Sequence, residues 1–460
     1  MDPQQRNVDG IGRLSNLDSA GILLRCDEIL EATYGSLGAS ETNSRLGLKR
    51  IADAERIIRR LGLETPHINP SAKVDVNVKD RPVVSFSLLS NLATHARKCC
   101  TPVRPRCTAC PLVSFCSDGL RSCAQRKVKP LAIDLCAGAG SLSAGFRREG
   151  FHIALAVEKN KHAAQSFRMN NPGVPVLEAD VRKIRPSRIL RILGLERGQL
   201  AAVISGPPCQ GFSAAGPRKP RASRNFIFRS IARIAKGLGA RQLMMENVPG
   251  LKRVNGVRFE NKILACFQKY GYLGQPIEVD ASKFGVPQRR KRLIFVCTQR
   301  NYRIHSFKLE PSKGTNRLTV EQALKGLPRP PAGNLKKGRR ARRQTVHNHR
   351  AMVHSTEVVQ KIRQIKPGEG PISYRRLPVG LAGTLIAGHR AMPVHPRLDR
   401  TITVREAARL QTMPDAFRFL GPHSEQPLQV ANVVPYRLSR AIARALLDAH
   451  LEGPGLNDGD

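Results

Sequence analysis

The chain has 460 residues, of which 77 are lysine or arginine and 35 are aspartate or glutamate, giving a formal net charge of +42. With 41% hydrophobic residues it is long enough for two or three domains with buried cores, which excludes a globally disordered protein. No apolar run is long enough for a transmembrane helix and no secretory signal opens the chain, so we expect a cytoplasmic, nucleoid-associated protein. The charge favours nucleic acid as partner, and the lack of tryptophan favours a duplex over a single strand.

The first part of the sequence predicts helices followed by a cysteine cluster. Residues 16–63 and 83–98 carry apolar side chains at helical spacing, so we expect a helical domain over 1–125. Six of the eleven cysteines lie within residues 99–123. Four of them have the spacing Cys100-x6-Cys107-x2-Cys110-x5-Cys116. Thiols so close together in a cytoplasmic protein indicate a metal site with zinc as the generic ion, while disulfides or unbonded thiols are the alternatives.

The segments HARKC and CPLVSFC, which flank this spacing, make it similar to the iron–sulfur loop of endonuclease-III-type DNA glycosylases. The resemblance implies that the four cysteines bind a [4Fe–4S] cluster, with zinc as the alternative. No helix-hairpin-helix segment and no lysine–aspartate pair of a bifunctional glycosylase accompanies the loop, so glycosylase activity is not expected. The loop either contacts phosphates through Arg104, Arg106 and Arg121 or only stabilises a small helical domain.

From residue 131 the pattern changes to strands that alternate with helices. The predicted strands are LAIDLC, HIALAVEKN, VPVLEAD, QLAAVISGPP, RQLMMENVPG and KRLIFVCTQ. Helical segments lie between them, among them LSAGFRREG, KHAAQSFRMN and FIFRSIARIAKGLG. This alternation predicts a doubly wound, Rossmann-like α/β domain with a parallel sheet over residues 131–299.

Residues 300–397 form a further part, with 21 lysines and arginines against four acidic residues. The densest run is KKGRRARR at 336–343, which includes Lys336, Lys337, Arg339 and Arg340. Such a run is either a solvated, mobile loop or a set of phosphate contacts. Helical pattern returns in TVREAARLQTM and YRLSRAIARALLDAHL, so we expect residues 398–450 to complete the α/β domain.

Glycines and acidic residues gather where predicted strands end. Gly138 and Gly140 lie in a turn between the first strand and a helix, where glycine lets the backbone approach a nucleotide closely. Glu158 ends the next strand, where a carboxylate accepts hydrogen bonds from ribose hydroxyls, and Asp180 ends the third, in reach of an exocyclic amine. The alternative is an ordinary α/β turn whose acidic residues cap helices.

One cysteine is presented differently from the others. In VISGPPCQGFS, Cys209 follows two prolines directly after a predicted strand, and the prolines stiffen the approach to a thiol at a loop tip. A buried structural cysteine needs no such presentation. Glu246, in MENVPG, ends a second strand. A thiol and a carboxylate at neighbouring strand ends, beside a glycine-rich loop, form a candidate active site.

Six motifs, DLCAGAGS, GPPCQGFS, ENVPG, QRRKR, TVREAARLQTMPD and QVANVVP, resemble in content and order those of the DNA (cytosine-5) methyltransferases, over roughly residues 131–450. The resemblance implies that the methyl donor S-adenosylmethionine binds at the glycine loop. The residues that it assigns to this cofactor are Asp134, Ala137, Gly138, Gly140, Glu158, Asp180, Pro207 and Asn432. The sequence departs from the family pattern at Cys136, Ser141, Lys159 and Ala431, which affects the packing around the cofactor.

The same resemblance implies a covalent mechanism on cytosine in duplex DNA. The Cys209 thiolate adds to C6 and raises the electron density at C5, which accepts the methyl group after the base has flipped out. Glu246 hydrogen-bonds N3 and the exocyclic amine, and Arg290 anchors the base and lowers the pKa of the thiol. Residues 300–397 correspond to the target-recognition region, with Arg292, Thr384 and the KKGRRARR run as DNA contacts. A helix that organises this region, or that is simply exposed and amphipathic, carries Arg405, Glu406, Arg409 and Gln411.

The sequence leaves rival functions to be weighed. Some tRNA methyltransferases share these motifs, although the long basic segment favours DNA. A non-catalytic DNA-binding protein would not need Cys209, Glu246 and Arg290, and a repair protein would need the glycosylase residues that are missing. We expect a monomer with no membrane partner, and a companion restriction endonuclease is possible but not decided by the sequence.

Overall fold

The computed structural model describes Leu92 and residues 129–208, 226–254, 257–302, 307–311, 317–331, 346–371, 374–386 and 392–451. The helices predicted within 16–63 and 83–98 lie outside these residues, apart from Leu92, which is helical and buried. The four cysteines of the predicted metal site lie outside them as well. Within the described part of the chain, no helix has the length and apolarity that a membrane span requires.

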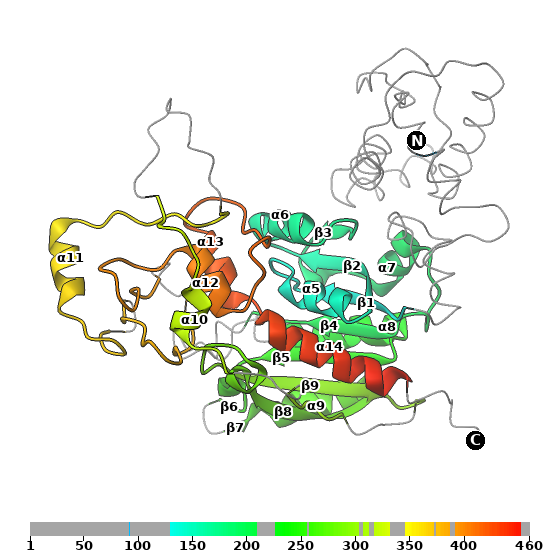
Figure 1. Cartoon of the computed structure of the whole chain (residues 1–460). Helices are drawn as coiled ribbons and strands as arrows, with labels where there is room; N and C mark the ends of the chain where they lie inside the picture. The colour runs from blue at the N-terminus through cyan, green and yellow to red at the C-terminus, as the bar shows by residue number, and fades with distance from the viewer. Residues whose placement is uncertain are drawn as a thin grey trace, which may run out of the picture.

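Seven strands form one sheet in the order β3-β2-β1-β4-β5-β9-β8 (Figure 1). They are β1 (Leu131–Leu135), β2 (His152–Glu158), β3 (Val176–Glu178), β4 (Ala202–Ser205), β5 (Gln242–Asn247), β8 (Tyr272–Asp280) and β9 (Lys291–Gln299). The first five are parallel, and their near-continuous apolar runs are buried, as in sheets covered on both faces. All six predicted strands are present in this sheet.

The sheet is mixed, because β9 runs antiparallel to both of its neighbours. The expectation of a wholly parallel sheet is therefore wrong at this edge. Only residues 281–290, which include the short helix η7 (Ala281–Phe284), join β8 to β9, and a parallel pair would need a longer crossover. The sequence pattern does not predict β8, because its segment YLGQPIEVD contains a glycine and a proline and lies at the half-exposed edge.

Helices cover both faces of the sheet (Figure 1). One layer consists of α7 (Pro186–Leu193), α8 (Ile227–Leu238) and α9 (Phe259–Lys269), and the other of α5 (Ser141–Arg148), α6 (Lys161–Asn170) and α14 (Tyr436–Leu451). In the first layer, Ile189, Ile231 and Phe267 belong to one buried apolar cluster. In the second, Phe146 and Leu438 belong to another, so the C-terminal helix shares a core with the first helix of the domain.

Short elements lie between the strands and the helices of the first layer. They are the 3₁₀ helices η4 (Val181–Lys183) and η6 (Pro249–Leu251), and a two-stranded ribbon of β6 (Arg253–Val254) and β7 (Val257–Arg258).

A third apolar cluster lies at one end of the molecule, where Figure 1 shows the short helices α10, α12 and α13 together. The elements of this end are α10 (Val320–Leu324), α11 (Thr356–Arg363), α12 (Val404–Leu410) and α13 (Gln426–Asn432). Ala139 of the glycine loop belongs to the same cluster, so this end adjoins the loops that follow β1. We call the described residues of 317–400 the recognition region.

Candidate active site

The glycine loop follows β1 where the strand order reverses between β2 and β4, the usual place for a ligand in open α/β sheets. Cys136, Gly138 and Gly140 all have positive φ, at 62°, 57° and 89°. A Cβ on Gly140 would lie 2.2 Å from Nδ2 of Asn171, so glycine is required there. The loop thus curls tightly and leads its backbone N–H groups into the first turn of α5.

Glu158 is fixed beside this loop at the end of β2. Its Oε2 accepts a hydrogen bond of 2.8 Å from the Gly138 N–H, and its Oε1 accepts one of 2.7 Å from the Asn160 N–H. Asn160 in turn caps α6 through its side chain. Two backbone donors therefore hold the predicted ribose-binding carboxylate at the loop.

Asp180 stands at the next strand end and is bound by two cations. Arg182 donates to it from its backbone N–H, Nε and a terminal guanidinium nitrogen, and Lys159 Nζ lies 3.1 Å from Oδ2. These hydrogen bonds, led by the Arg182 side chain, hold the pKa of Asp180 well below its usual value. The carboxylate is therefore ionised across the physiological range and remains a hydrogen-bond acceptor. Lys159 is one of the residues at which the sequence departs from the family pattern.

Asp134 lies inside β1 and is fully buried. Its Oδ2 accepts a 2.7 Å hydrogen bond from the Ser143 hydroxyl, which ties β1 to α5, whereas Oδ1 is buried without a hydrogen-bond partner. Burial raises the pKa of Asp134 to about 7. Asp134 therefore stabilises the glycine loop by joining the strand before it to the helix after it. Ala137, also assigned to the cofactor, donates its backbone N–H to Val157 O at 3.0 Å.

Glu246 is the penultimate residue of strand β5 and forms a buried ion pair that the sequence alone does not predict. Arg292 Nε lies 2.7 Å from Glu246 Oε1, and both side chains are about one-tenth exposed or less. A Cβ placed on Gly206 would lie 3.8 Å from Glu246 Oε2, so the carboxylate borders the backbone that leads to Cys209. Cys209 itself is outside the described residues.

The prolines before Cys209 are anchored to the same strand end. The carbonyl of Pro207 accepts a 3.3 Å hydrogen bond from Asn247 Nδ2, and Pro207 is buried whereas Pro208 is exposed. The chain therefore emerges from the sheet at Pro208, beside the Glu246–Arg292 pair. The loop that carries the Cys209 thiol would therefore begin at this point.

The structure places Arg290 differently from the prediction that it anchors the base near Glu246. A terminal nitrogen of Arg290 donates 3.0 Å hydrogen bonds to the carbonyls of Ala431 and Val433, and the side chain is buried. These two carbonyls flank Asn432, an exposed residue at the end of α13. Arg290 therefore positions the turn of a predicted cofactor residue, and Arg292, predicted as a DNA contact, is the arginine on Glu246. Side chains two residues apart in an extended segment point to the same side, so the QRRKR pattern allows either arginine to lie beside Glu246. Only the packing decides which of the two does so.

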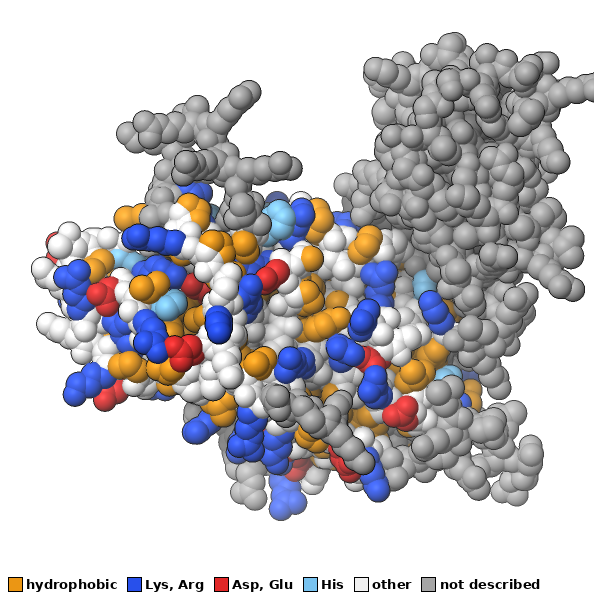
Figure 2. Space-filling model, viewed as in Figure 1, with side chains coloured by type: hydrophobic (Ala, Val, Ile, Leu, Met, Phe, Trp, Pro, Cys, Tyr) orange, Lys and Arg blue, Asp and Glu red, His pale blue; other side chains and the backbone are white. Residues whose placement is uncertain are grey.

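The recognition region docks directly on the QRRKR segment. The Arg289 N–H donates to Ala382 O at 2.8 Å, and the Thr384 hydroxyl donates to Arg289 O at 3.0 Å. Gln288 Oε1 accepts from the Leu385 N–H. Thr384 is exposed in the described structure, while Lys336, Lys337, Arg339 and Arg340 lie outside the described residues. On the face drawn in Figure 2, Lys and Arg side chains outnumber Asp and Glu.

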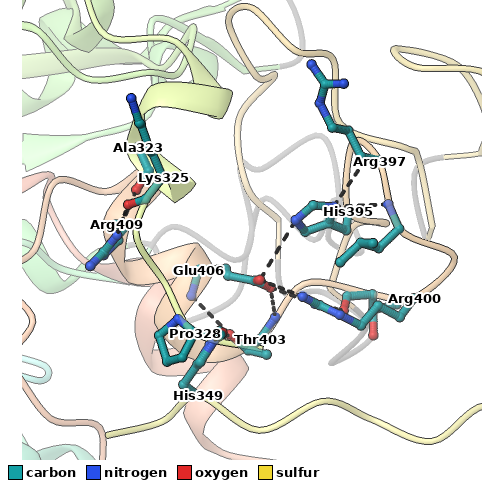
Figure 3. A network of polar contacts seen from close by, with 12 residues as sticks. Ala323, Lys325, Pro328, His349, His395, Arg397, Arg400, Thr403, Glu406 and Arg409 are labelled. Atoms are coloured by element: carbon teal, nitrogen blue, oxygen red, sulfur yellow. Dashed lines mark hydrogen bonds and ion pairs between the residues drawn. The ribbon is translucent and has the colours of Figure 1, made fainter. Parts of the chain in front are cut away.

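Helix α12 connects the recognition region to the α/β domain through buried polar groups (Figure 3). Glu406 pairs with Arg400 at 2.7 Å and completes a capping box with Thr403, whose hydroxyl also contacts His349 Nδ1 at 2.8 Å. The alternative of an exposed amphipathic helix is wrong, because every residue of α12 is buried except Arg409, which is partly exposed. Arg405 donates to the carbonyls of His347, Pro414 and Phe417.

The end of α12 makes similar contacts. Arg409 bonds the carbonyl of Lys325 at 2.8 Å and pairs with Asp415 at 2.6 Å, while buried Gln411 donates to Val430 O. The four residues singled out on this helix thus reach α10 and α13 as well as their own turn. Among the described residues, no group of three or more His, Cys, Asp or Glu side chains could hold a metal ion.

Comparison with known proteins identifies the family of the chain. Residues 131–448 match the family of C-5 cytosine-specific DNA methylases. The chain is 35% identical to the type II methyltransferase M1.HphI of Haemophilus parahaemolyticus, over 68% of this chain and 86% of that protein. It is 31% identical to the type II methyltransferase M.NgoMIV of Neisseria gonorrhoeae, over 69% and 97% respectively.

A solved structure supports the same assignment. The crystal structure of a prophage-encoded protein from Escherichia coli, assigned as a DNA modification methyltransferase, has a TM-score of 0.60 and 29% identity, covering 70% of this chain and 99% of that one. The fold and the site define an α/β methyltransferase. The chain belongs to the family of C-5 cytosine-specific DNA methylases.

Proposed function

We propose that the protein transfers a methyl group from S-adenosylmethionine to C5 of cytosine in duplex DNA. The observation that carries the proposal is the Glu246–Arg292 pair, 2.7 Å apart and buried beside Gly206, three residues before Cys209. A buried carboxylate next to a thiol-bearing loop, on the sheet edge that also carries the glycine loop, fits a cytosine better than a generic nucleotide. The family membership supports the same reaction.

Residues of three strand ends would hold the cofactor. Glu158 would accept hydrogen bonds from the ribose hydroxyls, and Asp180 from the exocyclic amine of adenine. Gly138 and Gly140 allow the backbone to approach, and Asn432, positioned by Arg290, closes the site from the far side. When bound, the cofactor supplies an electrophilic methyl group on a sulfonium.

The protein's own residues would then activate the base. The Cys209 thiolate would form a bond to C6, and the electron pair would move to C5, which is the atom that would receive the methyl group supplied by the cofactor, with S-adenosylhomocysteine as the other product. Glu246, held in place by Arg292, hydrogen-bonds N3 and the exocyclic amine as charge develops on the ring. A base then removes the C5 proton, and the Cys209–C6 bond breaks to release 5-methylcytosine. The target must flip out of the helix to reach this edge.

The reaction is tested at Cys209. Cys209→Ala should lower methyl transfer by at least about a thousandfold while leaving DNA binding intact, because it removes the attacking thiol and nothing else. A duplex with 5-fluorocytosine at the target should trap the wild-type protein covalently, since no C5 proton can leave. Cys266→Ala, a half-buried cysteine on α9, is the matched control and should stay active. A Cys209→Ala protein with a tenth of wild-type turnover would refute the covalent mechanism.

DNA would lie against the recognition region, with Thr384 and the KKGRRARR run as contacts. The net charge of +17 over residues 300–397 supports this placement. The recognition sequence is read out by bisulfite sequencing of DNA from cells that express the protein. Similarity to type II methyltransferases supports a companion restriction endonuclease, which the neighbouring genes would reveal.

We also retain the proposal that Cys100, Cys107, Cys110 and Cys116 bind a [4Fe–4S] cluster, which rests on their sequence spacing alone. Anaerobically purified protein should be brown and contain about four irons per chain. Colourless protein with one zinc would replace the cluster by a zinc site. Cys107→Ser should destabilise the N-terminal domain but leave the chemistry unchanged, because the residues assigned to methyl transfer all follow residue 131.

A further inference from the structure

A second strongly basic surface lies on the α7 and α8 layer, outside the site described above. The described residues 181–208 and 226–241 contain ten lysines and arginines and one acidic residue, Glu196. Seven of the ten basic residues are exposed. The net charge of +9 over these 44 residues is as dense as the +17 over the 98 residues of 300–397. Apart from Arg182, which binds Asp180, none of these basic residues is assigned to methyl transfer.

The basic residues of η4 and α7 point outward because the helix buries its other face. Arg185, Arg188 and Arg191 recur every three residues along α7, whereas Ile189 and Leu193 are buried against the sheet. On a helix this spacing puts the three arginines on one side within about two turns. Lys183 continues the row on η4, whereas the guanidinium of Arg182 is bound to Asp180. Arginine predominates, and its planar donor group suits phosphate oxygens better than lysine does.

Helix α8 extends the same surface as a rigid unit. Arg233 donates to the carbonyls of Arg182 and Ile184, at 3.4 and 2.9 Å, which joins α8 to η4. The two helices pack closely at Gly237, where a Cβ would lie 2.4 Å from Pro186. Exposed Lys236 stands on α8 beside this contact. The charges are therefore preorganised on one packed helix pair.

This surface is separate from the recognition region. The α7–α8 layer packs on the face of the sheet opposite α5 and α14, and Figure 1 shows it at the other end of the molecule from α10 to α13. A phosphate on Arg185 or Arg191 therefore cannot belong to the few base pairs read by Thr384.

We propose that the η4–α7–α8 surface binds duplex DNA outside the target site. This inference rests on the proposed function, because a duplex held at the active edge brings its own flanking phosphates to the protein at high effective concentration. Contacts of this kind carry no sequence information and add affinity that depends on salt. The surface would thus hold the protein on long DNA while the recognition region reads the target.

The test compares a short duplex that just covers the methylated site with one that extends it by about two helical turns, roughly 20 base pairs, on each side. The variant Lys183→Gln/Arg185→Gln/Arg191→Gln removes three exposed charges from the surface. It should bind the long duplex about tenfold more weakly, with a salt slope smaller by about 2 to 3, and bind the short duplex like wild type. The control Arg147→Gln/Arg148→Gln/Arg444→Gln removes three exposed charges from α5 and α14 in the other layer and should change neither.

Methyl transfer on the short duplex keeps the two proposals apart. If wild-type protein does not methylate it, the proposed function fails. If it does, and the surface variant binds the long duplex with wild-type affinity and slope, the surface does not bind flanking DNA. Equal weakening on both duplexes would also overturn the inference, because it would place the surface at the target. Free short duplex is then added to the complex with the long duplex. This competition distinguishes flanking phosphates of the same DNA molecule from phosphates of a second DNA molecule.

Discussion

The α/β domain and the recognition region are held together by different kinds of interaction. The sheet lies between two apolar clusters, and most of its strand residues are fully buried hydrophobics. The recognition region has a small apolar cluster and relies on buried ionic groups. Arg376 illustrates this: its guanidinium bonds the carbonyls of Ile362, Ile365, His395 and Leu398 and pairs with Asp399 at 2.9 Å.

The difference follows from the secondary structure. A sheet satisfies its backbone groups by its own ladder, so its side chains are free to be apolar. An irregular segment has buried carbonyls without a ladder, and arginine, with five N–H donors, satisfies several of them at once. The comparison teaches that the polar residues of the recognition region include structural ones, which must be separated from those that read DNA.

The largest effect should come from removing such an arginine. Arg376→Met keeps most of the side-chain volume but removes the side-chain donor to the carbonyls of Ile365, His395 and Leu398 and one of the two arginines on Asp399, and should destabilise the protein by about 3–5 kcal/mol. Hydrogen exchange should increase in the recognition region and not in the sheet. Exposed Arg375, whose Nε donates a hydrogen bond to Gly370 O, gives the control Arg375→Met. Equal loss of stability in both variants would contradict the structural role of Arg376.

A smaller effect is expected from a conservative change in the sheet core. Ile231→Val on α8 removes one buried methylene and should cost about 1 kcal/mol. Because the sheet and its layers form one apolar core, hydrogen exchange should rise across β1, β4 and β5 together. Exchange that rises only in α8 would show that the layer is less cooperative than its packing indicates.

The smallest effect should separate the two regions by pH. Burial lowers the pKa of His349, His354 and His395, in the last case to about 4, so these rings are neutral in the folded protein. The unfolded chain takes up protons near pH 6.5, so the stability of the recognition region is full above that pH and falls as the pH drops toward 4. In the sheet, the raised pKa of Asp134 and the lowered pKa of His152 act in opposite directions over this range.

The pH measurement is hydrogen exchange at pH 7 and pH 5, corrected for the intrinsic exchange rate. Protection of the recognition region should fall by about 1 kcal/mol, while that of the strands changes less. His395→Gln should reduce the difference, since it removes the ring with the largest shift. A sheet that loses protection first would reverse the comparison.

The same contrast explains what the sequence could predict. Buried strands are continuous apolar runs, so six of seven were found, and α6 has the predicted ends because Asn160 caps it. Helix α7 was missed because it is short, begins at a proline and carries several arginines. Charge marked the recognition region but not its contacts, since the carbonyls that Arg376 binds come from separate segments. For the same reason the QRRKR motif did not reveal which arginine meets Glu246.

The pairing of α14 with α5 has a consequence for how the protein is made. Residues near both ends of the domain fill one core: Phe146 lies on the first helix after β1, and Leu438 and Leu446 lie on the last. A ribosome that adds roughly 10 residues per second needs about half a minute between these helices. During that time the part of α5 that packs on α14 lacks its partner, and the turn that carries Asn432 does not yet exist. The core of the domain is therefore complete only after the final helix has left the ribosome, and we expect chains that end before α14 not to methylate DNA.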